Sequence, residues 1–180
     1  SCYLLNRIGG KKPYDFYDKI AVELAQVGCF RLSRRAIQHI TLDRCQAEAL
    51  LKVYELSKDE HDLAVLRKIV ESVGGEDRAT PANTYDRSEL WVDVYQVSGQ
   101  EQDIQNARLA AHEQTSTQYR TWTLARVYGE TRKVGDLVAA RASYNYSGRE
   151  GHENTDFVRG SSALGVYAVS GADEDLEVCR

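Results

Sequence analysis

Histidines are the first place to look for chemistry in this sequence, because histidine serves both as a metal ligand and as a general acid or base. The chain contains four of them, at His39, His61, His112 and His152. No two are separated by the four residues that would place both on one face of a helix, and there is no HExxH motif. The sequence therefore predicts no metal site and no catalytic centre built on histidine.

The cysteines form no catalytic or metal-binding pattern either. They occur at Cys2, Cys29, Cys45 and Cys179, without a CxxC pair. Cys29 lies near Arg31 and Arg34, whose charges favour a thiolate, but a single cysteine in a helix turn is usually inert. Four widely separated cysteines predict reduced thiols in a cytosol-like compartment, so we expect a cytoplasmic protein.

Other signatures of catalysis and of membrane insertion are missing from the sequence. There is no GxSxG motif and no glycine-rich phosphate loop followed by lysine and serine or threonine. No apolar run reaches the roughly 18 to 20 residues that cross a bilayer, and residues 1–12 lack the apolar region of a signal peptide. We therefore expect a protein that is not an enzyme, uses no cofactor and does not enter a membrane.

The pattern that does recur is structural, and it points to the elements that would position any binding residue. Four segments begin with Val-Tyr, and a serine or threonine follows the tyrosine by three residues, an aspartate by eight, a leucine or isoleucine by nine and an arginine by thirteen. Five matching columns without a gap indicate internal repetition. The segments are VYELSKDEHDLAVLR (53–67), VYQVSGQEQDIQNAR (94–108), VYGETRKVGDLVAAR (127–141) and VYAVSGADEDLEVCR (166–180).

Each column has a physical interpretation that predicts a pair of helices. Apolar residues three and four positions before each tyrosine mark one buried helical face, which the tyrosine ends. The serine or threonine, followed by Gly99 and Gly171 in two copies, predicts a turn. Acidic residues then mark the start of a second helix, where the repeated aspartate is expected. Residues 74–84 and 147–154 are predicted to be loops between successive pairs.

Residues 17–40 carry the clearest resemblance to a known family. They resemble a tetratricopeptide repeat, a helix pair of roughly 34 residues, with large, small, glycine and aromatic residues at the family's positions. The later copies are degenerate, and a related helix-pair class such as a HEAT-like array stays open. The matching residues are Tyr17, Ile20, Ala21, Leu24, Gly28, Phe30, Ser33, Ile37 and Ile40.

The resemblance implies an all-α fold, a right-handed α-solenoid of about five antiparallel helix pairs in which the last pair is incomplete. We expect residues 1–12 to be an N-terminal cap or the tail of a preceding segment, and residues 13–180 to form a single helical-repeat domain. The expected units lie near 13–42, 43–83, 84–116, 117–153 and 154–180.

The resemblance also implies a binding module, because the first helices of such repeats line a concave groove that holds peptides or helices of partner proteins. Tyr119, Trp122 and Arg126 are spaced three and four residues apart and would share one helical face. The alternative is that Trp122 packs against the neighbouring repeat. Counting back two, six or nine positions from the repeated tyrosines places these residues in the groove: Glu48, Lys52, Asp86, Glu89, Asp93, Tyr119, Trp122 and Arg126.

The distribution of charge indicates the kind of partner. Residues 1–44 have a net charge of +4 and residues 45–180 a net charge of −8. A nucleic-acid partner would need a basic stripe along the molecule, and only Arg31, Arg34, Arg35 and Arg44 approach one. The acidic groove residues instead predict a protein or peptide partner that is basic or of mixed charge.

A second function, self-association as a structural subunit, is predicted from the C-terminal end. The last copy stops five residues after Asp175, so its second helix cannot match the length expected in the earlier copies. The apolar face of residues 158–171 would then be poorly covered, and exposed ends of helical repeats tend to stack on one another.

Overall fold

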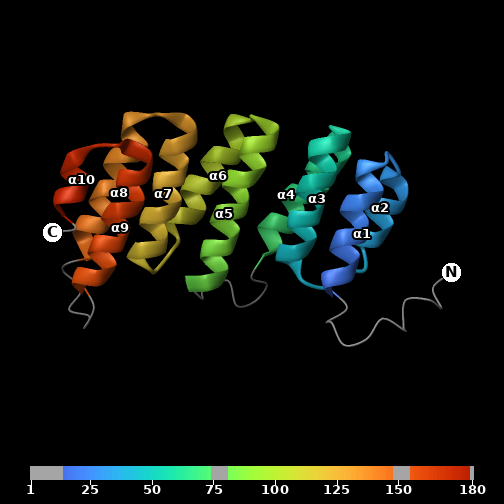
Figure 1. Ribbon diagram of the computed structural model, residues 1–180, viewed down its shortest axis with the longest axis horizontal. Coiled ribbons are helices and arrows are strands. Elements are labelled where there is room, and N and C mark those ends of the chain that lie inside the picture. Colours follow the sequence, from blue (N-terminus) through green and yellow to red (C-terminus); the bar gives the residue numbers. More distant parts are fainter. Residues whose placement is uncertain (1–13, 74–80, 148–154, 179–180) are drawn as a thin grey trace. The chain divides into compact units, whose positions relative to one another are not determined.

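The structure is a computed structural model that describes residues 14–73, 81–147 and 155–178. Within these ranges it contains ten α-helices and no strand (Figure 1), which confirms the all-α prediction. Contacts divide the chain into two compact units, residues 1–72 and residues 73–180. Residues 1–12, predicted to be a cap or tail, lie outside the described ranges. No helix in those ranges has both the length and the apolar character needed to cross a bilayer.

The first unit consists of four helices, α1 (Tyr14–Gln26), α2 (Phe30–Ile37), α3 (Asp43–Ser57) and α4 (Glu60–Ser72). Helix α1 packs on α2 and α3, and α3 also packs on α2 and α4. Gly28, with φ +77°, permits the sharp turn between α1 and α2. Small residues let these two helices approach closely enough for the buried Ser33 hydroxyl to donate to the Ala21 carbonyl at 2.6 Å.

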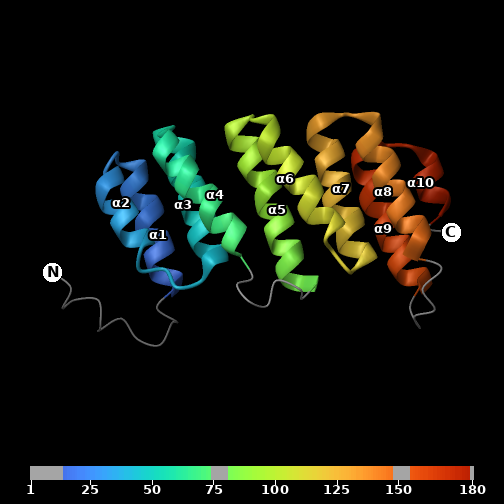
Figure 2. The ribbon, with the colours of Figure 1, turned by 180° about the vertical axis from the view of Figure 1, so that it is seen from behind.

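The second unit contains six helices: α5 (Pro81–Ser98), α6 (Glu101–His112), α7 (Thr117–Thr131), α8 (Val134–Ser147), α9 (Thr155–Ser170) and α10 (Asp173–Glu177). Helix α7 packs on both α5 and α9, so these three lie side by side, as the opposite views in Figures 1 and 2 show. Helix α6 packs on α5 and α7, α8 on α7 and α9, and α10 on α9.

The start of α5 corrects one prediction. Residues 74–84 were expected to form a loop, but residues 81–84 belong to α5. Proline is favoured at the first position of a helix because its fixed φ suits the helix and its missing N–H is not needed there. Pro81 therefore starts the helix. Gly74 and Gly75 lie outside the described residues.

The core confirms the predicted stripe but shifts its end. Leu50, Leu51, Leu124 and Ala125, three and four positions before a repeated tyrosine, are all buried. The valine before each tyrosine has no exposed surface in any of the four copies, whereas only the tyrosine of the first copy, Tyr54, is buried. The valine is therefore the core residue of the Val-Tyr pair, and the other three tyrosines are half-buried at the edge.

The predicted turns occur where the serine and threonine column stands. Helices α3, α5, α7 and α9 end at Ser57, Ser98, Thr131 and Ser170. The next residue always has a positive φ. It is glycine in two copies, at Gly99 and Gly171, as predicted, but Lys58 and Arg132 adopt the same left-handed conformation, with φ of 52° and 54°.

Candidate functional site

The repeated aspartates are helix-start residues, as predicted, and each accepts a hydrogen bond within its own repeat. Each is the third residue of a second helix and is buried. The serine or threonine that ends the first helix donates its hydroxyl to this carboxylate, over 2.5 to 2.8 Å in the four copies. The same hydroxyl accepts the backbone N–H two residues further on, over 3.1 to 3.2 Å. The motif therefore fixes the turn between the two helices.

Asp62, Asp136 and Asp175 also bind an arginine of the preceding second helix. In the first unit Arg34 of α2 donates from Nε to Asp62 at 2.6 Å. In the second unit Arg108 of α6 makes two bonds of 2.7 Å to Asp136, and Arg141 of α8 makes two of 2.9 Å to Asp175. The aligned segments contain a column of aspartates and a column of arginines, the latter including Arg108 and Arg141. That an arginine of one helix pair bonds to the aspartate of the next was not predicted.

These bonds set the ionisation of the carboxylates. Burial opposes the charge of Asp136, but hydrogen bonds from Arg108 and Thr131 outweigh it and lower the pKa of Asp136. The same balance lowers the pKa of Asp175. Burial and the bond from its hydroxyl to Asp175, 3.0 Å long, raise the pKa of Tyr144 to about 12. Carboxylates that are buried and bonded in this way hold the fold together and are not available to a partner.

Of the eight residues predicted to line a groove, Glu48 and Lys52 belong to the first unit. Both are exposed on α3. Glu48 pairs with Arg44 at 2.9 Å and Lys52 with Glu55 at 3.2 Å, so each ion pair runs along the helix surface. Such exposed pairs contribute little to stability.

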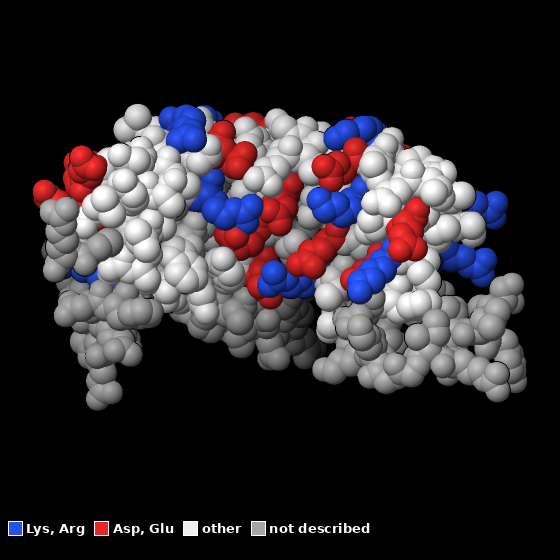
Figure 3. Space-filling model, in the orientation of Figure 1, with Lys and Arg blue, Asp and Glu red and all other residues white. Residues whose placement is uncertain are grey.

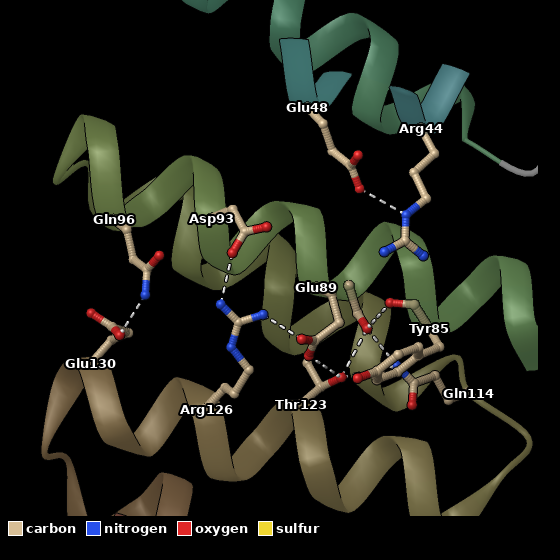
Figure 4. Close-up of polar contacts among 11 residues, drawn as sticks. Arg44, Glu48, Tyr85, Glu89, Asp93, Gln96, Gln114, Thr123, Arg126 and Glu130 are labelled. Carbon is tan, nitrogen blue, oxygen red and sulfur yellow. Dashed lines mark hydrogen bonds and ion pairs between the residues drawn. The ribbon is translucent and has the colours of Figure 1, made fainter. Parts of the chain in front are cut away.

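The other six predicted residues lie on α5 and α7, and contacts join Glu89, Asp93 and Arg126 as well as Tyr119 and Trp122. Arg126 of α7 extends toward α5, where it pairs with Glu89 and also with Asp93 at 2.7 Å (Figure 4). One turn further along, the Gln96 amide donates to Glu130 at 2.8 Å. A row of polar contacts therefore joins the two helices, and Asp86 lies one turn before Glu89 on α5.

In this row three acidic side chains, Glu89, Asp93 and Glu130, accompany one basic side chain, Arg126. Burial raises the pKa of Glu89, although the charge of Arg126 favours its ionised form. Burial also opposes the charge of Arg126, but the bonds with Asp93 and Glu89 outweigh it and raise the pKa of Arg126. The guanidinium is therefore permanently charged and shared by two carboxylates.

A cluster of three aromatic rings continues the row toward the start of α7. Tyr85 of α5 stacks on Tyr119, with ring centroids 4.7 Å apart, and Trp122 contacts both rings edge-on. All three side chains are half-buried. Tyr119 and Trp122 were predicted to share a face, but Tyr85 was missed because it lies ten positions before its tyrosine, outside the spacings considered.

Trp122 is held from its other side by α9. Its indole nitrogen lies 3.5 Å from the Ser161 carbonyl oxygen, which it faces as a donor. A Cβ added to Gly165 would come within 2.9 Å of the indole ring, so glycine leaves the room that this ring occupies. Trp122 thus packs against the next first helix, as the alternative interpretation expected, while it stays half-buried.

Beneath the row lies a buried polar network that the sequence did not reveal. The Ser88 and Thr123 hydroxyls are 2.9 Å apart, and the Gln114 side-chain amide donates to both of them. Thr123 also donates to Glu89 at 3.3 Å. The network connects the core between α5, α6 and α7 to the surface and holds Glu89 in place.

We call the surface built by these three helices the α5–α7–α9 face. Its residues are Tyr85, Asp86, Glu89 and Asp93 of α5, Tyr119, Trp122, Arg126 and Glu130 of α7, and Ser161 and Gly165 of α9.

Two further observations concern chemistry and relatedness. In the described parts of the chain no three or more histidine, cysteine, aspartate or glutamate side chains are placed to hold a metal ion. Cys29 and Cys45 are not joined in a disulfide. Comparison of the chain with models of known families, with curated proteins and with solved structures finds no match.

Proposed function

We propose that this protein is a non-catalytic binding module that holds a peptide segment of a partner protein on the α5–α7–α9 face. The observation that carries this proposal is the cluster of Tyr85, Tyr119 and Trp122, three half-buried rings beside a row of charged residues. Aromatic residues and arginine are the types that contribute most to binding at protein interfaces. Rings that already pack on one another lose little side-chain freedom when a partner covers them.

We further propose that the helix pairs form an α-solenoid of the tetratricopeptide type. Three first helices of the second unit lie in one layer, and Arg108 and Arg141 bind the aspartate of the following pair. Repetition of one contact from pair to pair is expected when each repeat interacts with its neighbours only. A cytoplasmic location and the lack of a nucleic-acid partner stay predictions.

Selection from a displayed library of random twelve-residue peptides tests the binding proposal. We expect enriched peptides whose affinity falls about tenfold or more in the Trp122→Leu variant, because a central aromatic contact contributes about 2 kcal/mol or more at an interface. The Val138→Ser variant is a matched control, since Val138 is exposed on α8, away from the face.

The melting temperature of each variant separates lost binding from lost folding. If the selected peptides bind Trp122→Leu and the natural protein equally well while both are folded, the partner does not use this face and the proposal is wrong.

A second candidate function, self-association, is favoured by Leu164. This residue lies three positions before its tyrosine, where Leu51, Val92 and Ala125 are buried in the other copies, yet 54% of its surface is exposed. We propose that a second copy of the chain covers this side of α9. Light scattering should show a mass that rises above 20.3 kDa with concentration, and Leu164→Glu should keep the protein at the monomer mass. A natural protein that stays monomeric at high concentration contradicts this function.

A further inference from the structure

We infer that the partner segment carries a lysine or arginine and, three or four residues away, an apolar side chain, and that it lies extended across α7. This inference rests on the proposed binding function and specifies its partner. Two neighbouring seams of the second unit support it, an acidic seam between α5 and α7 and an uncharged seam between α7 and α9.

The acidic seam carries a charge that its own residues leave unbalanced. Glu89, Asp93 and Glu130 supply three carboxylates against the single guanidinium of Arg126, a net charge of −2. Glu130 bonds to the amide of Gln96, which is neutral. Acidic side chains gather over α5 in Figure 3, whereas the surface over α9 is largely uncharged.

This balance selects the charge of the partner. Arg126 is already shared by two carboxylates, so a carboxylate of the partner would have to compete with them for the guanidinium. A lysine or arginine instead meets Asp93 and Glu130, whose side chains are partly or fully exposed. Like charges placed opposite each other at an interface are costly, so the seam excludes acidic segments as well as attracting basic ones.

The second seam suits an apolar side chain. Trp122 lies against Ser161 and Gly165, and these two residues present no charge and little bulk. The half-buried indole, together with Ser161 and Gly165, therefore forms an uncharged surface beside the acidic one. An aliphatic side chain that covers the indole removes apolar surface from water without burying an unpaired polar group.

The distance between the seams sets the spacing in the partner. Packed helices are about 8–10 Å apart, so the two seams are separated by about this distance across α7. Arg126, which pairs with the Asp93 carboxylate that the cation meets, is one turn from Trp122, and this adds about 5–6 Å along the helix axis. The diagonal is then about 10–12 Å, and an extended chain covers about 3.3 Å per residue. Three or four residues therefore separate the cation from the apolar side chain.

A series of ten-residue peptides tests this spacing. Each is acetylated and amidated, has a background of glycine and serine, and carries one arginine and one leucine separated by one, three, four or eight positions. Binding is followed by the indole N–H resonance of Trp122 in ¹⁵N-labelled protein. Trp91, whose side chain is 4% exposed, provides an internal reference that a surface contact leaves unchanged.

We expect the peptides with separations of three and four to bind about tenfold more tightly than those with one or eight, because only they can reach both seams at once. Replacing the arginine of the peptides by glutamate should abolish the difference in affinity between the separations. Glu130→Gln, which keeps a side chain able to bond Gln96, should weaken the arginine peptides and leave a leucine-only peptide unaffected. Higher salt should weaken only the part of the affinity that depends on the arginine.

The outcomes separate this inference from the function on which it rests. If all separations shift the Trp122 resonance equally, or if the glutamate peptide binds as well as the arginine peptide, the inference is overturned while the binding function stands. If library peptides bind through Trp122 but lack a cation, the inference is likewise overturned. If neither the defined nor the selected peptides reach Trp122, the binding function fails with it.

Discussion

Gly165 offers the sharpest test of how the α7–α9 seam is built. Replacing a helical glycine by alanine normally stabilises a protein by about 0.5–1 kcal/mol, because glycine loses more backbone freedom on folding. Gly160→Ala, in the same helix, should show this gain, because outside the adjoining backbone no atom of the described residues lies within 4 Å of the added Cβ. It is the matched control for Gly165→Ala.

At Gly165 the added Cβ would lie 2.9 Å from Cδ1 and 3.2 Å from Nε1 of Trp122. Carbon atoms in good contact are about 3.5–4.0 Å apart, so the indole must move by roughly 0.5–1 Å. Overpacking of this kind costs about 1–3 kcal/mol. The cost cancels or exceeds the gain from alanine, and the two variants should differ in unfolding free energy by about 1–3 kcal/mol.

Urea denaturation followed by circular dichroism measures this difference, and tryptophan emission reports the displaced ring directly. We expect a red-shifted emission in Gly165→Ala alone, since Trp91 is buried and stays in place in both variants. In a Trp122→Leu background the two alanine variants should behave alike. An equal gain in stability from both alanines in the natural background would refute this account of the seam.

Three further predictions concern the second unit, and urea denaturation checks each of them. Asp136→Ala should lower the unfolding free energy by about 3 kcal/mol, because it removes a buried carboxylate and leaves the half-buried Arg108 without its main partner. Glu101→Ala, which removes an exposed partner of Arg108, should change little. The folded-state pKa of Asp136 lies below its ordinary value of 3.8, so its stabilising contribution is complete above that value and disappears as pH falls through the folded pKa. Stability should therefore fall in this acidic range, and less steeply in Asp136→Asn, whereas a fall of equal slope contradicts the assignment. Ser162→Ala should leave stability unchanged or raise it by up to about 1 kcal/mol, because the buried Ser162 hydroxyl has no hydrogen-bond partner among the described residues; a clear loss would contradict this.

The helix boundaries were predictable from the sequence because they depend on local chemistry. A serine or threonine that accepts a backbone N–H and a residue with positive φ end α3, α5, α7 and α9, so Ser98 and Gly99 suffice to mark the turn after α5. Pro81 was placed in a loop because proline both ends and starts helices, and only the residues around it decide which. The bounds of the helices were therefore predictable, apart from this first turn of α5 and Ser147, which was placed in a loop but ends α8. The rest of that predicted loop, residues 148–154, lies outside the described residues.

The candidate face was only partly predictable, because it depends on contacts between helices. The spacing along α7 placed Tyr119, Trp122 and Arg126 on one side of the helix. It could not show that Arg126 bonds to α5 whereas Trp122 packs against α9. Gly165 appears in the sequence as one of thirteen glycines. Its role follows from the position of a ring on another helix, which no pattern along one helix contains.

The bonds between arginine and aspartate have a consequence for how such a chain can change in length. In the helix pair of α7 and α8, the second helix carries both residues of this contact. Asp136 accepts from Arg108 of the preceding pair, and Arg141 donates to Asp175 of the following one. If residues 117–147 were duplicated as a block, each arginine would still be followed by a helix pair that carries an aspartate to bond with it. Duplicating α8 alone would add another buried aspartate without the threonine that ends α7. We therefore expect gene duplication to be tolerated in whole helix pairs, which would make the pair the unit by which this architecture can grow.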